Sequence, residues 1–308
     1  MQIREATELD IPQIIEVLRA SLGETSSKKT EEVWRYKHLD NPFGKSLVLV
    51  ATEGEKIIGV RAFMRWQWQK GEQIYSAFRA VDTATHPDHQ GKGIFKKLTL
   101  KALEIAKERG DHFVFNTPNK QSKPGYLKMG WVEVDKLKIH LRTLNLIQFK
   151  KKKEKDYSFP GDEDNIRDLQ NFYFEQLKAT DRLFTPKDIA FLKWRYLHNP
   201  LQNYLVIFDR EYFIAGYVKE WKMFNEFRVS EAIVSKLGKK TTKSAILKLA
   251  KSSGSAVLSI SPDAGIHFKT GITGNFGPVL TYKPINLNQP EFLNLKTWTY
   301  SLGDLELF

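Results

Sequence analysis

The pattern of apolar and polar residues along this 308-residue chain predicts the same series of helices and strands twice. In four segments apolar residues recur every three or four positions, the spacing of one buried helix face. Shorter segments alternate or are continuously apolar, which is typical of strands. The predicted helices are 8–20, 93–109, 166–180 and 241–252, and the predicted strands are 46–52, 56–66, 73–85, 112–116, 203–208, 211–222, 226–235 and 255–260.

A short motif recurs in the same places. Trp34-Arg35-Tyr36 precedes Asn41-Pro42, and Trp194-Arg195-Tyr196 precedes Asn199-Pro200. Each motif lies at the end of a second predicted helix, which Asn-Pro ends because the residue before proline disfavours helical geometry. We interpret the chain as a tandem duplication and this motif as a structural anchor rather than part of a site.

The repeat predicts two domains, residues 1–145 and 165–308, with a charged linker over 146–164. Two domains of about 150 residues are typical for a chain of this length. Each predicted domain combines a sheet with helices, so the fold class is α/β (α+β). The sequence does not predict the oligomeric state.

Composition narrows the function classes. The chain has no cysteine, which excludes disulfides, thiolate nucleophiles and cysteine-based metal sites. The seven histidines lack ligand spacing, so no metal site is predicted. The net charge of +12 favours an anionic partner, but part of it lies in the lysine run of the linker, and we do not expect nucleic acid. Without a signal peptide or a membrane-length apolar stretch, a cytoplasmic location is the expectation.

A glycine turn follows the third predicted strand. Gln90-Gly91-Lys92-Gly93-Ile94-Phe95 connects that strand to the helix 93–109. Glycines allow backbone torsions that other residues avoid, and consecutive N–H groups at a helix start can surround a pyrophosphate. A G-x-G alone is equally compatible with a purely structural turn.

A second segment follows the buried strand 112–116. It contains six residues whose spacing forms a motif: Asn119, Ser122, Tyr126, Lys128, Gly130 and Trp131. With both segments in this order, the first half resembles the GNAT superfamily of acyl-CoA-dependent N-acyltransferases. That family has a Q/R-x-x-G-x-G/A turn and a downstream Asn…Ser…Tyr-x-Lys-x-Gly-Phe segment. Phe95 departs from the small residue expected at the last position of the turn.

The resemblance implies a fold, a co-substrate and its contacts. It implies two tandem GNAT-like domains, each a mixed, mostly antiparallel twisted sheet flanked by helices. In the first, the fourth and fifth strands splay apart around the pantetheine arm of acetyl-CoA. The cofactor-binding residues would be Thr83, Ala84, Thr85, Gln90, Gly91, Lys92, Gly93, Ile94, Phe95, Asn119 and Ser122.

The chemistry needs an acid and a base. Tyr126 stands where the family's tyrosine protonates the departing thiolate, with a core aromatic as the alternative. Asp82 is the best-placed carboxylate to take a proton from the amine, with a structural hydrogen bond as the alternative. His86 and His89 flank the turn and are weaker candidates.

The second half departs from the family. Its turn, Ser235–Thr241, lacks the glycine spacing, and Phe268 replaces the tyrosine. We therefore expect one active site, in the first half, that acetylates a primary amine of a small or peptide-like molecule by direct attack in a ternary complex. Two alternatives remain open: a FemAB-like aminoacyl transferase that uses aminoacyl-tRNA, and a non-catalytic acyl-CoA-binding or scaffold protein.

Overall fold

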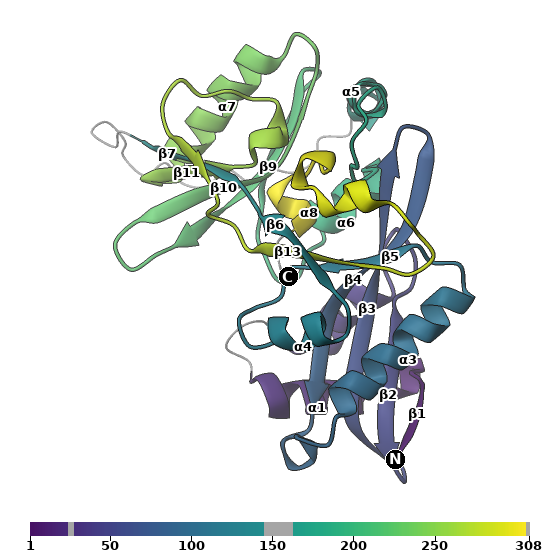
Figure 1. Ribbon diagram of the computed structural model, residues 1–308. Helices are drawn as coiled ribbons and strands as arrows, with labels where there is room; N and C mark the ends of the chain where they lie inside the picture. The colour runs from purple at the N-terminus through teal and green to yellow at the C-terminus, as the bar shows by residue number, and fades with distance from the viewer. Residues whose placement is uncertain (24–27, 145–162, 306–308) are drawn as a thin grey trace.

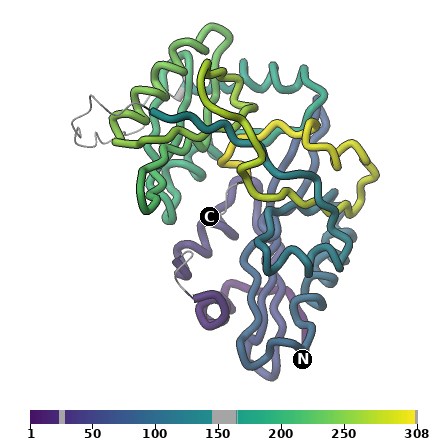
Figure 2. The backbone as a smooth tube through the Cα atoms, turned by 60° about the vertical axis from the view of Figure 1, so that its left-hand side comes forward, coloured from purple at the N-terminus to yellow at the C-terminus, as the bar shows by residue number. Residues whose placement is uncertain are grey.

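Two twisted sheets flanked by helices form the molecule (Figure 1). The computed structural model describes residues 1–23, 28–144 and 163–305. Figure 2 shows the two bodies from another side, with the purple-to-blue first half below the green second half. The predicted fold class is confirmed: helices flank two mostly antiparallel sheets.

The first sheet has the strand order β1-β2-β3-β4-β5-β13-β6. Its centre is the long antiparallel pair β3 and β4, and β3 is buried over most of its length. β4 pairs with β5 in parallel over only three residues. The strands are β1 (Gln2–Glu5), β2 (Leu47–Glu53), β3 (Lys56–Lys70), β4 (Gln73–Thr85), β5 (Phe113–Asn116), β6 (Val132–Lys136) and β13 (Val279–Pro284).

Helices cover both faces of this sheet. α1 (Ile11–Leu22) buries Ile14 and Leu18 on one face, beside α2 (Glu31–His38). α3 (Ile94–Glu108) and the short α4 (Lys123–Lys128) lie on the other face. Gly110, with φ 78°, follows α3 as the sequence predicts.

The second sheet repeats much of this plan, in the order β12-β7-β11-β10-β9-β8. α7 packs on one face of it, against β9 and β10. Its strands are β7 (Ile139–Thr143), β8 (Leu205–Phe208), β9 (Tyr212–Glu220), β10 (Asn225–Val234), β11 (Val257–Ile260) and β12 (Ile272–Gly274). Its helices are α5 (Glu163–Lys178), α6 (Ile189–Tyr196), α7 (Lys239–Ser252) and α8 (Leu302–Leu305), and the chain's 3₁₀ turns are Glu8–Asp10, Pro87–His89, Pro262–Ala264, Pro290–Leu293 and Leu295–Thr297.

The central strands of the two sheets share a β-bulge. In β4 the pairing with β3 skips Asp82, and in β10 the pairing with β9 skips Ser230. A bulge bends its strand and redirects a side chain, and bulges are common near active sites. The matching bulges agree with the tandem duplication inferred from the sequence.

Each half contributes one strand to the sheet of the other. β13, from the second half, lies between β5 and β6, and β7, from the first half, lies between β11 and β12. Figure 1 shows the teal strand β7 beside β11 and the yellow-green strand β13 beside β6. The division into residues 1–145 and 165–308 stays a prediction, and most of the predicted linker lies outside the described residues.

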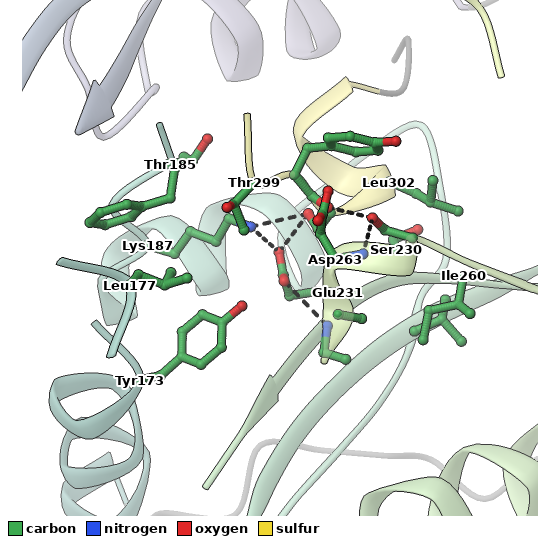
Figure 3. A pocket seen from close by; sticks show the side chains of 17 residues that line it. Tyr173, Leu177, Thr185, Lys187, Ser230, Glu231, Ile260, Asp263, Thr299 and Leu302 are labelled. Carbon is green, nitrogen blue, oxygen red and sulfur yellow. Dashed lines mark hydrogen bonds and ion pairs between the residues drawn. The ribbon is translucent and has the colours of Figure 1, made fainter. Parts of the chain in front are cut away.

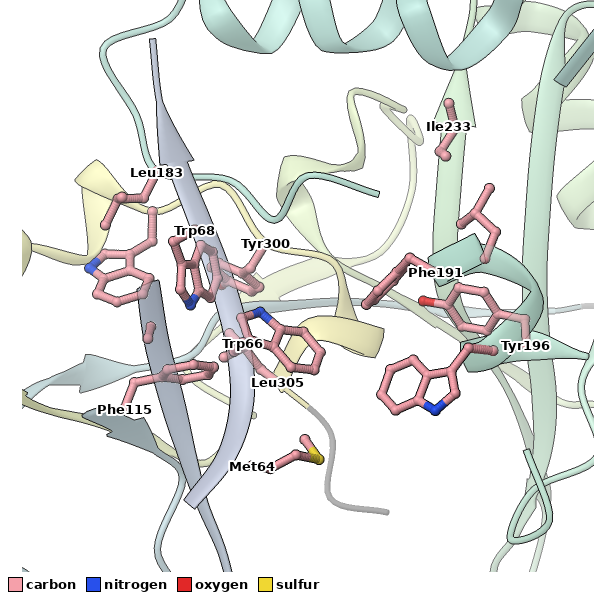
Figure 4. Packing of buried hydrophobic residues seen from close by; sticks show 14 of the residues in the cluster. Met64, Trp66, Trp68, Phe115, Leu183, Phe191, Tyr196, Ile233, Tyr300 and Leu305 are labelled. Carbon is pink, nitrogen blue, oxygen red and sulfur yellow. The ribbon is translucent and has the colours of Figure 1, made fainter. Parts of the chain in front are cut away.

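A single apolar core joins the two halves (Figure 4). Trp66 and Trp68 on β3 pack with Phe115, with Phe191 on α6, and with Trp298 near the C-terminus. Aromatic pairs of this kind add about 0.5–1.5 kcal/mol each beyond the area they bury. The repeated anchor motif belongs to this core, because the rings of Tyr36 and Trp194 stack with centroids 5.0 Å apart.

Candidate acyl-transfer site

The glycine turn presents a row of open backbone donors. Gly91 and Gly93 have φ values of 75° and 72°, and an added Cβ at either position would meet nothing within 4 Å. The first four N–H groups of any α-helix lack partners within the helix, and the turn before α3 contributes further N–H groups to this set. Among the described residues no protein acceptor pairs with the N–H groups of Gly91, Lys92, Gly93, Ile94, Phe95 and Lys96.

These donors fit a pyrophosphate. The start of α3 adds the positive end of a fifteen-residue helix. Lys92 and Lys96 are exposed beside it and add charge. Gln90 is held at the turn, since its Nε2 donates to the carbonyl oxygen of Thr85 at 3.4 Å. The predicted cradle therefore has the open geometry that the sequence pattern requires.

The strand before the turn has an open edge. β4 and β5 pair from Ala77 to Arg79 and then diverge, so the predicted splay is present. Thr83, Ala84 and Thr85 pair with β3 on one side, and the other side faces no described strand. An open strand edge can hydrogen-bond an extended ligand, which is the role predicted for these three residues.

Phe95 fits the turn because a glycine faces it. Its ring packs against α4, where an added Cβ on Gly125 would lie 3.0 Å from the Phe95 ring. The ring also meets Tyr126 edge-on, with centroids 5.6 Å apart. The bulky residue thus packs against α4 and leaves the N–H groups of the turn open.

Tyr126 lies 5 % exposed on α4, between Phe95 and Trp131. Its hydroxyl accepts a hydrogen bond from Nη1 of Arg61 at 2.7 Å. An oxygen that accepts from a guanidinium keeps its own hydrogen to donate elsewhere. The Tyr126 hydroxyl can therefore still donate its hydrogen to another acceptor, and its acid role stays a prediction.

Asn119 and Ser122 order the turn that leads into α4. The Oδ1 atom of Asn119 accepts from the N–H groups of Gln121 at 3.0 Å and Ser122 at 2.8 Å. The hydroxyl of Ser122 donates to the same oxygen at 3.0 Å. These contacts give both residues a structural role, and their contact with a cofactor stays a prediction.

Asp82, the bulged residue of β4, turns toward α2. Its Oδ2 atom accepts from Nε2 of His38 at 3.0 Å and forms an ion pair with Lys37. Nδ1 of His38 lies 2.9 Å from the hydroxyl of Ser46. Asp82 is also the only non-glycine residue of the described chain with a positive φ, 37°. Strain of this kind persists only where the surroundings enforce it.

The charges of this cluster follow from its burial. Burial opposes the charge of Asp82, but Lys37 and the hydrogen bond from His38 outweigh it and hold the pKa of the carboxyl well below its usual range. Burial lowers the pKa of His38 despite the nearby carboxylate. Asp82 is thus ionised, and His38 neutral, at physiological pH. The assignment of Asp82 as the base stays a prediction.

His86 and His89 lie on the outer side of the turn. Nδ1 of His86 accepts from the N–H of Asp88 at 3.4 Å, which fixes the 3₁₀ turn. Nδ1 of His89 lies 3.7 Å from Glu53 and 3.4 Å from Nζ of Lys92. Neither contact links these histidines to Tyr126 or Asp82.

Three residues of the candidate site lie outside the motifs that the sequence revealed. Arg61 stands in the middle of an apolar strand, an unusual place for a charge. Lys37 and His38 directly follow the anchor motif, and the second half has Leu197 at the position of Lys37. This difference between the two copies of the motif could have indicated that Lys37 has a role specific to the first half.

A cavity of about 250 Å³ lies between the two halves. Thr117, directly after β5, and Leu305 form part of its wall. Leu137, Ile139 and Pro278 make it largely apolar, and Tyr217, Lys219 and Arg228 add polar groups from β9 and β10. Its walls thus come from both halves of the chain.

In the second half the corresponding turn is closed. Gly238 has an ordinary φ of −78°, and its N–H donates to the Ser235 hydroxyl at 3.0 Å. An added Cβ there would lie 2.5 Å from the carbonyl oxygen of Glu211. The predicted loss of the open turn is therefore visible in its geometry.

The C-terminal segment fills the space beside β10 and β11. The hydroxyl of Ser261 donates to the carbonyl oxygen of Tyr300 at 2.6 Å. Lys187 lies 2.7 Å from Glu231 (Figure 3). It also lies 2.9 Å from Asp304. These contacts leave a cavity of only about 20 Å³, room for about one water molecule.

The described residues contain neither a metal-type cluster nor a membrane-length apolar helix. Within them, no three histidine or acidic side chains are grouped as a metal site would require. No helix in the described part of the chain is both long and apolar enough to cross a membrane.

Comparisons with known proteins agree with this geometry. Residues 2–134 match the family model of the acetyltransferase (GNAT) domain. No curated protein gives a significant sequence match. Among solved structures, a probable N-acyltransferase from Enterococcus faecalis V583 has a TM-score of 0.66 at 10 % identity, over 93 % of this chain and 73 % of the other.

Two GCN5-related N-acetyltransferases are similar to the same extent. The one from Anabaena variabilis ATCC 29413 has a TM-score of 0.63 at 13 % identity, over 92 % of this chain and 73 % of the other. The one from Kribbella flavida has a TM-score of 0.66 at 13 % identity, over 92 % and 71 %. At these identities the similarity concerns the fold, and it extends over both halves.

Proposed function

Because residues 2–134 match the acetyltransferase (GNAT) domain, we propose that the chain transfers an acetyl group from acetyl-CoA to a primary amine. The observation that carries this proposal is the row of open N–H groups at Gly91–Lys96, next to the open edge of β4. The second half, where the turn is closed, serves as a partner in the acceptor pocket.

Three parts of the chain would hold the donor. The turn and the start of α3 would bind the pyrophosphate, and Thr83, Ala84 and Thr85 would pair with the pantetheine arm. Bound acetyl-CoA supplies an acyl group activated as a thioester. Tyr126 then contributes an O–H donor on the α3 face of the sheet, at the sulfur that leaves.

Asp82 would act from the opposite face, beside α2. Its negative charge is fixed by Lys37 and His38, so it can attract and orient a protonated amine. A carboxylate with a lowered pKa is a weak base. The amine therefore loses its proton to a water molecule beside Asp82, and the carboxyl itself stays ionised.

The cavity between the halves is the proposed acceptor pocket. Its volume of about 250 Å³ suits a small molecule rather than a folded protein. Lys219 and Arg228 lie at its wall, and Arg228 also pairs with Glu226 at 2.9 Å, so this wall offers an acceptor polar contacts rather than a free cation.

Turnover tests the proposal. Purified protein with acetyl-CoA and a panel of amino acids, amino sugars and polyamines should release thiol with at least one acceptor. Tyr126→Phe should lower kcat by roughly 10²-fold with little change in the KM for acetyl-CoA. Tyr282→Phe is the matched control, because Tyr282 lies on β13 and its hydroxyl has no hydrogen-bond partner among the described residues.

Two results would count against the assignment. Binding of acetyl-CoA without thiol release for any amine would favour a non-catalytic role. Equal kcat values for Tyr126→Phe and Tyr282→Phe would remove Tyr126 from the reaction while leaving the acetyl-CoA site in place.

A further inference from the structure

The core of the first half contains a guanidinium that no carboxylate neutralises. Arg61, on β3, is fully buried. Its Nη1 atom donates to the hydroxyls of Thr83 and Tyr126. No ion pair is found for Arg61 within the described chain, and its Nε and Nη2 atoms lack any hydrogen-bond partner.

An uncompensated charge in a protein interior is costly, since burial removes the water that stabilises it. Three aromatic rings surround the guanidinium: its central carbon lies 4.7 Å from the Phe63 centroid, 5.2 Å from that of Tyr126 and 5.6 Å from that of Phe95. Ring faces attract a desolvated cation by roughly 2 kcal/mol or more, but they carry no net negative charge that would neutralise the guanidinium. The surroundings therefore favour an anion that arrives from outside the chain.

The two sheets differ at this position. In the first sheet, the residue after the bulge is Thr83, and it pairs with Arg61 of β3. In the second sheet, the residue after the bulge is Glu231, and it pairs with Ala215 of β9. Ala215 therefore stands at the position of Arg61. The buried cation is thus found in the half with the open glycine turn and is replaced in the half whose turn is closed. A purely structural role would not predict this difference.

We propose that Arg61 binds the sulfur of coenzyme A as a thiolate. This inference rests on the proposed function and adds a residue and a charge state to it. When the amine forms its C–N bond, the C–S bond breaks and its electron pair stays on sulfur. Arg61 neutralises that charge, Tyr126 donates a hydrogen bond to it and keeps its own proton, and the proton lost by the amine goes to water.

Proton release on binding tests this directly. A free thiol has a pKa of about 8.5, so coenzyme A is mainly a neutral thiol at pH 7.0. Calorimetric titrations in two buffers of different ionisation enthalpy give the number of protons released. We expect close to one proton for coenzyme A and none for desulfo-coenzyme A, which has no sulfur.

Arg61→Met should abolish this release while desulfo-coenzyme A still binds. The variant should keep or raise Tm, because it removes an unpaired buried charge. Its kcat should fall roughly 10²-fold with a nearly unchanged KM for acetyl-CoA. Arg61→Lys should restore part of the proton release.

Arg65→Met is the matched control on the same strand. Arg65 already has a carboxylate partner, Asp111, so its loss should leave the proton release unchanged. Release that is absent in the wild type, or equal in the wild type and Arg61→Met, would overturn the role of Arg61 while the proposed function stands. If neither coenzyme A nor its desulfo analogue binds, the proposed function and this inference both fail.

Discussion

Asp82 combines backbone strain with a buried charge cluster. The bulge forces φ to 37°, and Lys37 and His38 hold the carboxylate in place. A non-glycine residue at positive φ costs of order 1–3 kcal/mol, so these contacts must offset the strain. The cluster stabilises the bulge that opens the edge of β4.

Asp82→Asn should therefore destabilise the protein. The Lys37 side chain is 6 % exposed, and it would lose the carboxylate that balances its charge. We expect a loss of about 3 kcal/mol in the free energy of unfolding at pH 7, measured by urea denaturation. Asp40→Asn, at an exposed position at the end of α2, should change it little.

The pH dependence of that loss follows from the sign of the pKa shift. A carboxyl whose pKa is lowered by folding stabilises the protein above its ordinary pKa, about 3.9, and this contribution is lost as the pH falls further. The difference between wild type and Asp82→Asn should be constant from pH 8 to about 5 and shrink below about 4. A difference that already changes between pH 8 and 6 would contradict the shift.

Residue roles could be predicted from the sequence only where the residues of the site lie close together along the chain. Two short segments contain the glycine turn and the residues Asn119, Ser122 and Tyr126, so their spacing revealed them. Arg61, Lys37 and His38 meet Tyr126 and Asp82 only through tertiary packing, and no spacing encodes such contacts. Phe95 departed from the family pattern, and its partner Gly125 became visible only in the folded chain.

At the scale of elements, a buried ion cluster helps to hold the C-terminal segment, beside the hydrogen bonds that Arg79 and Arg195 donate to its carbonyl oxygens. Burial disfavours the charge on Lys187, but Asp304 and Glu231 raise its pKa above the ordinary value. The hydroxyl of Ser301 also donates to Glu231 at 2.9 Å. The segment, including α8, is thereby fastened over the end of β10.

Lys187→Met should loosen this segment. Two buried carboxylates would then lose their shared cation, which we expect to cost about 3–5 kcal/mol. Hydrogen exchange of residues 299–305 should rise more than that of β3 or α3. Lys193→Met, which changes a lysine on the neighbouring helix α6 outside this cluster, is the control. Unchanged exchange in 299–305 would show that other contacts hold the segment.

The periodicity of apolar residues predicted most helices and strands, but it did not predict which strands pair with one another. The predicted helices and strands lie within a few residues of the observed ones. The exchange of β7 and β13 could not be predicted, because strands of only five and six residues carry too little pattern to specify the sheet in which they pair. Pairing is decided by the rest of the sheet.

At the scale of the whole molecule, the exchanged strands and the shared aromatic core should make folding cooperative. Removing either half would leave β5 and β6, or β11 and β12, without the strand between them. We expect one unfolding transition, with calorimetric and van't Hoff enthalpies in agreement. Two transitions separated in temperature would show that the halves unfold independently.

One acyl-CoA should bind each chain, at the glycine turn, and titration calorimetry with acetyl-CoA measures this number. We predict one site per chain, lost in Gly93→Asp and kept in Gly110→Asp. Both glycines have positive φ and open space, but only Gly93 faces the proposed pyrophosphate. No binding in the wild type, two sites per chain, or equal affinity in both variants would contradict the account.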